Sequence, residues 1–182
     1  MLRDTRTEYS ALGLVMEGEG LMFTANELMG VMKLDGYKDR IVAFQPNHIH
    51  MAEFRDFDQE ILDGYGRPHI QDYAVDGLSY TAMCDGKVYA MFGLYPLWKG
   101  VAEAWLLPSA KLENRKMVFH KACLRFFPYA SEKLNLHRIQ VYVRSSNVQA
   151  VKWIEMMYFN QEGLLKRYGP DINDYYCYGR LF

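Results

Sequence analysis

The chain has 182 residues, of which 50% are apolar and 24% are charged. This length and composition predict one folded domain with a short extension, and they exclude an intrinsically disordered protein. The richest apolar run, Val88 to Trp98, is too short to span a membrane. The first twenty residues contain charged side chains and no apolar signal segment, so we expect a cytoplasmic protein without membrane association.

The net charge of −1 hides a difference between the two parts of the chain. Residues 1–100 contain 9 Lys or Arg and 15 Asp or Glu, a net −6, whereas residues 101–182 contain 12 and 7, a net +5. An anionic ligand is therefore expected to bind the second part. The isoelectric point of about 6.5 is far below that of a typical nucleic-acid-binding domain, so we expect no nucleic-acid partner.

Residues 1–40 are predicted to form an N-terminal extension with one short helix. Thr24 and Glu27 have the spacing of a capping box, and Phe23 and Leu28 have that of a hydrophobic staple. Together they predict a helix over residues 25–33.

A separate domain is predicted from residue 41 to residue 182. Its first elements follow in chain order: a strand at 41–44, helices at 48–62 and 68–75, and strands at 78–84, 87–94 and 101–107. The dipeptide Asp85-Gly86 between two of these strands is a strong hairpin signal, so the three strands are expected to form an antiparallel meander.

The second half of this domain begins with a long stretch that contains no glycine, from Val101 to Glu162. Apolar spacing predicts a long helix over 114–127 that ends or kinks at Pro128, with a final turn to Leu134. The remaining predicted elements are a strand at 138–143, a helix at 148–157 and strands at 161–167 and 175–182. This order predicts an α+β fold around one mixed sheet.

Several motifs in the last third of the chain point to a known fold. The segment Tyr129 to Ile139 is followed by Asn147 at a helix start, by Glu162-Gly163 and by Asp174-Tyr175-Tyr176. These motifs resemble the C-terminal half of the GNAT acetyltransferases, especially those that acetylate ribosomal-protein N-termini. The resemblance implies a GNAT fold over residues 41–182. In this fold four antiparallel strands are followed by a parallel pair, here 101–107 with 138–143, and then by the last two strands, with helices flanking the sheet.

The resemblance also implies that acetyl-CoA binds with its pyrophosphate at the start of the long helix, where the family has a glycine-rich segment. In this chain the segment Pro108 to Met117 contains no glycine. Side chains are therefore expected to contact the cofactor instead, namely Lys111, Asn114, Arg115 and Lys116. The alternative is that the cations form a solvated basic helix face.

Other family positions are matched in part. Asn147 corresponds to an asparagine that contacts the pantetheine arm, and a plain helix cap explains it equally well. Ile154 replaces the tyrosine that protonates the leaving thiolate in many relatives. Tyr176 and Tyr178 share one face of the last strand, where they either line a substrate cleft or pack within the sheet.

Glu103 is expected to lie on a central strand near the cleft and to act as the general base for an amine substrate. The alternative is an ordinary surface carboxylate. His48 and His50 are two residues apart in a predicted helix and so face different directions, which predicts no metal site. Three widely spaced cysteines fit neither a disulfide framework nor a zinc site, and we expect them to be buried: Cys84, Cys123 and Cys177.

Two functions are compatible with these features. The missing glycines and the missing tyrosine favour a GNAT-fold protein that has lost the chemistry and serves as an interaction module. A chain with these losses resembles the degenerate GNAT-like virion proteins of podophages. The resemblance implies that a protein partner binds residues 1–40 of this chain and that the protein is located in the virion. The alternative is an active N-acetyltransferase that moves acetyl from acetyl-CoA to a primary amine, either of a protein N-terminus or of a small molecule.

Overall fold

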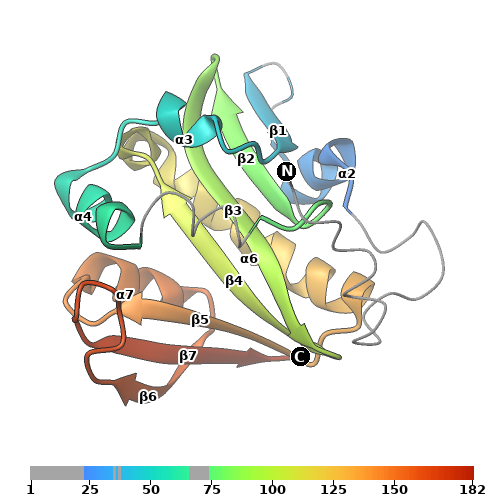
Figure 1. The fold of residues 1–182 in the computed structure, drawn as a ribbon. Helices are drawn as coiled ribbons and strands as arrows, with labels where there is room; N and C mark the ends of the chain where they lie inside the picture. The colour runs from blue at the N-terminus through green and yellow to red at the C-terminus, as the bar shows by residue number, and fades with distance from the viewer. Residues whose placement is uncertain (1–22, 35, 37, 66–73) are drawn as a thin grey trace.

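The fold is described from a computed structural model over residues 23–34, 36, 38–65 and 74–182 (Figure 1). Residues 1–22 of the predicted extension and residues 68–73 of the predicted second helix lie outside these ranges. Within the described ranges, no helix is both long and apolar enough to cross a membrane.

One sheet of seven strands runs through the molecule. Its strands are β1 (Asp39–Ala43), β2 (Ser79–Cys84), β3 (Lys87–Trp98), β4 (Val101–Pro108), β5 (Arg138–Arg144), β6 (Asn160–Leu165) and β7 (Tyr175–Leu181). Their order in the sheet is β1-β2-β3-β4-β5-β7-β6, and β4 and β5 are parallel whereas the other neighbours are antiparallel. The predicted mixed α+β sheet is therefore confirmed, with its parallel pair at the predicted place.

The hairpin between β2 and β3 forms where the sequence predicts it. Asp85 and Gly86 have φ angles of 49° and 74°, as a two-residue turn with positive φ at both positions requires. Gly100, with φ of 80°, forms the next turn, between β3 and β4.

Helices flank the sheet on both faces. They are α2 (Ala25–Met32), α3 (His48–Met51), α4 (Asp56–Tyr65), the 3-10 helix η1 (Ala110–Arg115), α6 (Lys116–Leu134) and α7 (Val148–Met156). The predicted capping box is present at the start of α2, where the Thr24 side chain accepts from the Glu27 N–H and the Glu27 side chain accepts from the Thr24 N–H.

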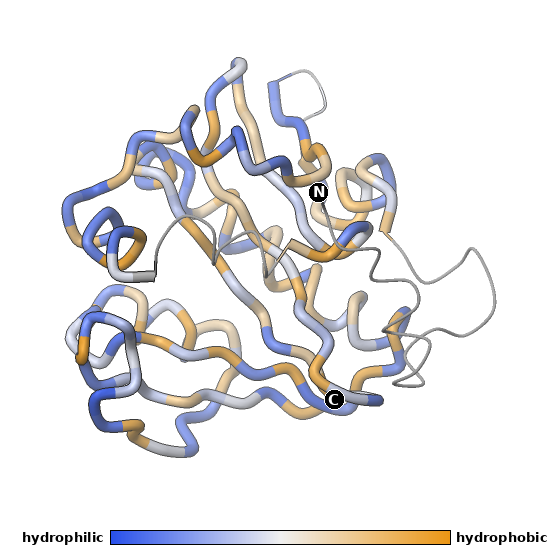
Figure 2. Tube along the Cα trace, in the orientation of Figure 1, coloured by the Kyte–Doolittle hydropathy of each residue, from blue (hydrophilic) through white to orange (hydrophobic). Residues whose placement is uncertain are grey.

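The core has a large and a small part, one on each face of the sheet. On the large side, α2, α6 and α7 pack against alternate strand residues such as Ala102 and Ile139. On the small side, α3 contributes Ile49, which lies in one cluster with Phe44 and Met91. Figure 2 shows this apolar character along the central strands, while α4 includes several hydrophilic residues.

Two helix predictions need correction. The predicted helix 48–62 is broken into α3 and α4, and Ala52 between them is extended. The Glu53 carbonyl accepts the Ala110 N–H at 2.7 Å, so tertiary contact replaces the bond that a continuous helix would form. The predicted helix 114–127 begins earlier, as η1. It continues as α6 through Pro128 to Leu134, because the turns before and after Pro128 both pack into the core.

Candidate functional site

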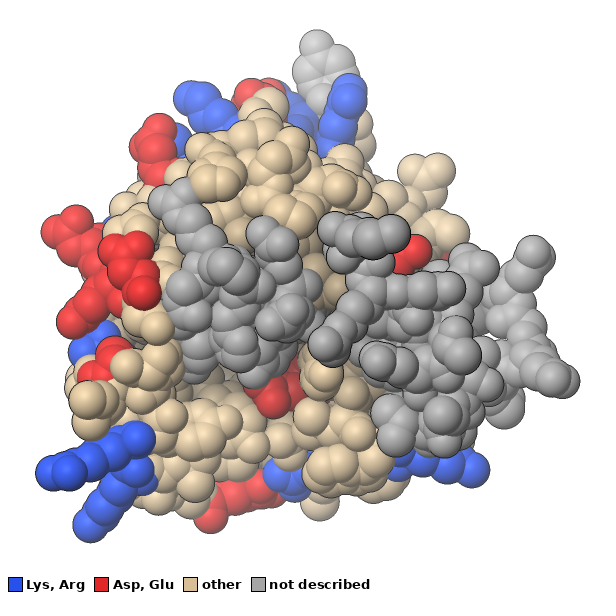
Figure 3. Space-filling model, in the orientation of Figure 1, with Lys and Arg blue, Asp and Glu red and all other residues tan. Residues whose placement is uncertain are grey.

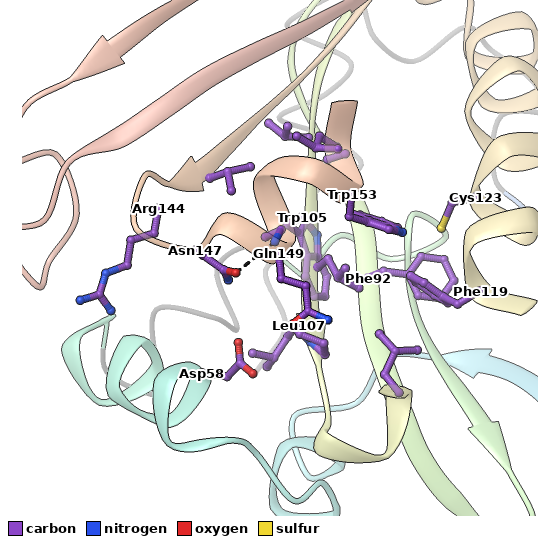
Figure 4. Close-up of a pocket in the computed structure, with 18 of the residues that line it drawn as sticks. Asp58, Phe92, Trp105, Leu107, Phe119, Cys123, Arg144, Asn147, Gln149 and Trp153 are labelled. Carbon is purple, nitrogen blue, oxygen red and sulfur yellow. Dashed lines mark hydrogen bonds between the residues drawn. The ribbon is translucent and has the colours of Figure 1, made fainter. Parts of the chain in front are cut away.

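A cavity opens where β4 and β5 separate. The two strands pair only over Val101–Glu103 and Arg138–Gln140, and beyond these residues they diverge (Figure 1). The cavity has a volume of about 680 Å³ and is lined by both strands together with residues of α4, α6 and α7. Its lining is mainly apolar and aromatic, and includes Phe92, Leu107, Phe119 and Trp153 (Figure 4).

Glu103 lines this cavity at the last position where β4 and β5 still pair. It lies opposite Tyr95 on β3 and Gln140 on β5. The residue is half-buried, and its burial raises the pKa of the carboxyl to about 7. A carboxylate with this pKa is suited to take a proton from a substrate at neutral pH.

Three tyrosines line the cavity near Glu103. The Tyr142 and Tyr168 ring centroids are 5.0 Å apart, and those of Tyr168 and Tyr175 are 5.9 Å apart. The charge of Glu103 contributes to raising the pKa of Tyr142 and Tyr168, after the larger contribution of burial, which shows that it lies close to both. The sequence analysis singled out Tyr175 as part of a motif but missed Tyr142 and Tyr168 as cavity residues, since only the fold brings these two together.

The tyrosines that the sequence singled out lie on the other face of the sheet. Tyr178 is buried in the core and its hydroxyl donates to Glu155 of α7 at 3.1 Å. Tyr176 packs against the same cluster. Of the two alternatives for this pair, the structure supports packing within the sheet.

The predicted cofactor-binding residues of the 108–117 segment are spread over different surroundings. The Lys111 ammonium is 2.8 Å from Glu53, and the Arg115 guanidinium turns toward β1, where it is 2.7 Å from Asp39. Asn114 is exposed on η1. Lys116 is exposed as well, lines the cavity and lies 3.8 Å from Glu113. Of these four residues, Lys116 alone appears among the cavity-lining residues that the structure describes.

Asn147 fits both alternatives given for it. It lines the cavity near its mouth, and its side-chain oxygen accepts the Ala150 N–H at 3.0 Å, which caps α7. The dashed line in Figure 4 marks this cap. The side-chain amide nitrogen is not used by the cap and remains a donor for a ligand.

A polar bridge crosses the cavity mouth from Arg55, which directly precedes α4, to α7. Arg55 donates to Glu113 at 3.2 Å and to Gln149 at 3.3 Å, and Gln149 donates to Glu113 at 3.0 Å. We call these three residues the rim bridge. No pattern in the sequence indicates this bridge, because Glu113 and Gln149 are 58 and 94 residues from Arg55 and meet it only in the fold.

Arg144, at the end of β5, holds α4 beside the cavity. Its guanidinium donates to Glu60 at 3.0 Å and lies 4.6 Å from the centre of the Phe57 ring. Figure 4 shows this side chain pointing toward α4. The helix therefore covers one side of the cavity through contacts to β5 as well as through the rim bridge.

Of the two histidines of α3, His48 has a structural role. His48 Nδ1 accepts the Gln45 N–H at 3.2 Å and lies 2.8 Å from Thr81 Oγ1, and burial lowers its pKa. Among the residues that the structure describes, no group of three His, Cys, Asp or Glu side chains is placed to hold a metal ion. All three cysteines are free thiols; Cys84 and Cys123 are buried and Cys177 is half-buried.

No protein-family model matches the sequence, and no curated protein sequence matches it significantly. Solved structures do match the fold. Ard1 from Thermoplasma volcanium aligns with a TM-score of 0.66 at 18% identity, over 79% of this chain and 97% of that one. A GNAT-family acetyltransferase from Bacillus anthracis aligns with a TM-score of 0.58 at 15% identity, over 79% and 95% of the two chains.

A third match is the ribosomal L7/L12 alpha-N-protein acetyltransferase RimL in complex with coenzyme A. Its TM-score is 0.57 at 11% identity, and the alignment covers 80% of this chain and 94% of that one. At these identities the likeness concerns the fold. The chain therefore has the fold of the GNAT acetyltransferases.

Proposed function

We propose that this protein is an N-acyltransferase that moves an acyl group from a thioester to a primary amine. The observation that supports this most strongly is the position of Glu103 in the cavity between β4 and β5, with a pKa raised to about 7. The fold shared with acetyltransferases agrees with it.

The chemistry requires two proton transfers. Glu103 takes the first proton from the substrate ammonium, and the free amine then attacks the thioester carbonyl. The new C–N bond forms as the C–S bond breaks, and the second proton passes to the leaving thiolate. Ile154 stands at the position of the tyrosine donor and is buried in the core, so the second proton passes from the attacking nitrogen to the thiolate sulfur with a water molecule as the relay.

The cavity suits the acyl end of acetyl-CoA, the expected donor. The apolar walls from β4 and α7 fit an acyl group and a pantetheine arm, and the Asn147 amide supplies a polar group near the mouth. The segment before α6 fits the diphosphate less well, because its N–H groups at Ser109 and Ala110 already donate to Tyr89 and Glu53.

A thiol-release assay tests the proposal. Wild-type protein is mixed with acetyl-CoA or acetyl-pantetheine and a panel of primary amines that includes short peptides. Glu103→Gln is expected to lower the turnover by about 10²-fold, because general-base catalysis is lost while the shape of the side chain is kept.

The matched control is Glu132→Gln, on the exposed end of α6, which is expected to leave turnover unchanged. Equal turnover in the Glu103→Gln and Glu132→Gln variants would contradict the role of Glu103. Absence of acyl transfer with every donor and amine would contradict the proposed function.

A second candidate function is the non-catalytic interaction module expected from the sequence, with a protein partner on residues 1–40 and a location in the virion. The engaged N–H groups at Ser109 and Ala110 favour it, because they reduce the anion-binding capacity of this helix start. It predicts a folded protein that binds neither acetyl-CoA nor acetyl-pantetheine, which calorimetric titration of both donors measures.

A further inference from the structure

We infer that the acyl donor is held by its pantetheine arm and that the nucleotide half of acetyl-CoA adds no affinity. This inference rests on the proposed acyltransferase function and names the class of its donor, an S-acyl pantetheine. Three features of the cavity mouth support it: the backbone donors, the paired cations and the rim bridge.

The first feature is that three backbone donors at the start of η1 are engaged within the protein. The Ser109 N–H donates to the Tyr89 carbonyl at 3.0 Å, and the Ala110 N–H donates to the Glu53 carbonyl at 2.7 Å. The Leu112 N–H donates back to Ser109 at 3.0 Å. A helix start binds phosphate through N–H groups that lack a partner. This helix start therefore has few N–H groups left to bind a diphosphate.

The second feature is that the cations of the same segment are already paired with carboxylates of the first half of the chain. Lys111 pairs with Glu53, and Arg115 is held by Asp39 together with the Cys84 sulfur, 3.2 Å away. Moving either cation to a phosphate would break an ion pair, and for Arg115 the lost pair is with the buried carboxylate of Asp39, which is unfavourable.

The third feature is a carboxylate at the cavity mouth, that of Glu113. The rim bridge holds the Glu113 carboxylate between Arg55 and Gln149, on the helix that would face the diphosphate. Arg55 is shared with Asp58, at 2.7 Å. Figure 3 shows further acidic side chains gathered over α4, whose sequence contains Asp56, Asp58, Glu60 and Asp63.

Two other lysines line the mouth and leave it with a small positive charge. Lys116 lies 3.8 Å from Glu113, and Lys152 is exposed on α7. With Arg55 they exceed the carboxylates of Asp58 and Glu113 by one positive charge, whereas the nucleotide half of acetyl-CoA brings two diphosphate charges and a 3′-phosphate. Exposed lysines are also well hydrated and contribute little to the affinity for an anion.

The interior of the cavity has the opposite character, and it suits the arm. Its apolar walls include Trp105 and Leu107 from β4, Val141 from β5 and Trp153 from α7. Figure 4 shows the two tryptophans and Leu107 around the cavity. Its volume of about 680 Å³ lies in the range of pockets that bury small ligands. Affinity therefore comes from burial of the arm and the acyl group.

An S-acyl pantetheine has two sources, a soluble thioester such as acetyl-CoA and the phosphopantetheine arm of a carrier protein. The shared chemistry is the acylated arm. Acetyl-phosphopantetheine separates the sources, because it keeps the single phosphate of a carrier-bound arm and lacks the nucleotide.

The test is calorimetric titration of the full chain with acetyl-pantetheine, acetyl-phosphopantetheine and acetyl-CoA at the same ionic strength. We expect the dissociation constants for acetyl-pantetheine and acetyl-CoA to agree within about threefold. Acetyl-phosphopantetheine that binds more tightly than both supports a carrier-bound arm, and one that binds equally supports a soluble donor. Acetyl-CoA that binds more than about tenfold more tightly than acetyl-pantetheine would overturn the inference and leave the proposed function standing.

A rim variant adds a second measurement. Glu113→Gln removes the negative charge of the rim bridge, and we expect it to tighten acetyl-CoA binding by a few fold while acetyl-pantetheine binding stays the same. Glu132→Gln, far along α6, is the matched control and is expected to change neither. If no donor binds to a protein shown to be folded, both the inference and the proposed function fail.

Discussion

Glu103 illustrates what the sequence reveals about a single residue and what it does not. The run of β-forming residues after Gly100 predicts that Glu103 lies on a strand, and the structure confirms this. Its raised pKa comes from burial at the point where β4 and β5 stop pairing. That point is set by contacts between segments 37 residues apart, such as Glu103 and Gln140, with a helix between them. No local pattern in the sequence encodes it.

The buried carboxyl of Glu103 gives a stability prediction that does not depend on activity. Its folded-state pKa of about 7 lies above the ordinary 4.5, so the folded protein favours the protonated form and loses stability as the pH rises through this window. Glu103→Gln is therefore expected to be more stable than wild type by about 1–2 kcal/mol at pH 8, after allowance for solvent screening.

Urea denaturation of wild type and Glu103→Gln at pH 8 and at pH 4.5 measures this difference. The advantage of the variant should shrink toward the lower pH, where Glu103 is protonated in the folded state. A stability difference that does not change with pH would show that burial does not raise the pKa of the Glu103 carboxyl.

At the level of elements, the sequence predicts local structure well and packing partners poorly. The capping box of α2 and the turn at Asp85-Gly86 are read from neighbouring residues, and both are present. That α2 packs on α6 was not predicted, because its Glu27 contacts Tyr129 and Lys133, which are more than a hundred residues away. The break between α3 and α4 escaped prediction for the same reason, since it depends on the bond between Glu53 and Ala110.

Glu27 is expected to fasten α2 in a pH-dependent way. Burial alone would raise its pKa, but bonds from Lys133, Tyr129 and the Thr24 N–H outweigh burial and lower it below 4.5. A lowered carboxyl pKa means that the stabilisation is complete above pH 4.5 and is lost as the pH falls through the folded-state pKa. Glu27→Gln should cost about 1 kcal/mol at pH 7.

Thermal or urea unfolding at pH 7 and at pH 3 tests the role of Glu27. The difference between wild type and Glu27→Gln should shrink as the pH falls from 7 to 3, because the wild-type side chain takes up a proton. An undiminished difference at pH 3 would mean that shape, and not charge, holds α2 on α6.

For the whole molecule, the order of elements was sufficient to predict the mixed sheet, and the resemblance to the GNAT acetyltransferases placed its parallel pair. The charge difference between the two halves was interpreted as attraction for an anionic ligand. In the folded chain, however, many of these charges form ion pairs with one another. Cations of the second half pair with carboxylates of the first, as in Lys111 with Glu53, Arg115 with Asp39 and Arg144 with Glu60. Composition cannot distinguish the two uses, because the pairs form only when the chain folds.

The pH dependence of kcat/KM for acyl transfer, measured for wild type and Glu103→Gln with the same amine, tests the central claim most directly. We predict that the wild-type profile rises through a pKa near 7 and that this limb is absent from the profile of the variant, whose remaining pH dependence reflects the amine alone. Identical profiles for the two proteins would contradict the claim that Glu103 in the cavity between β4 and β5 is the general base.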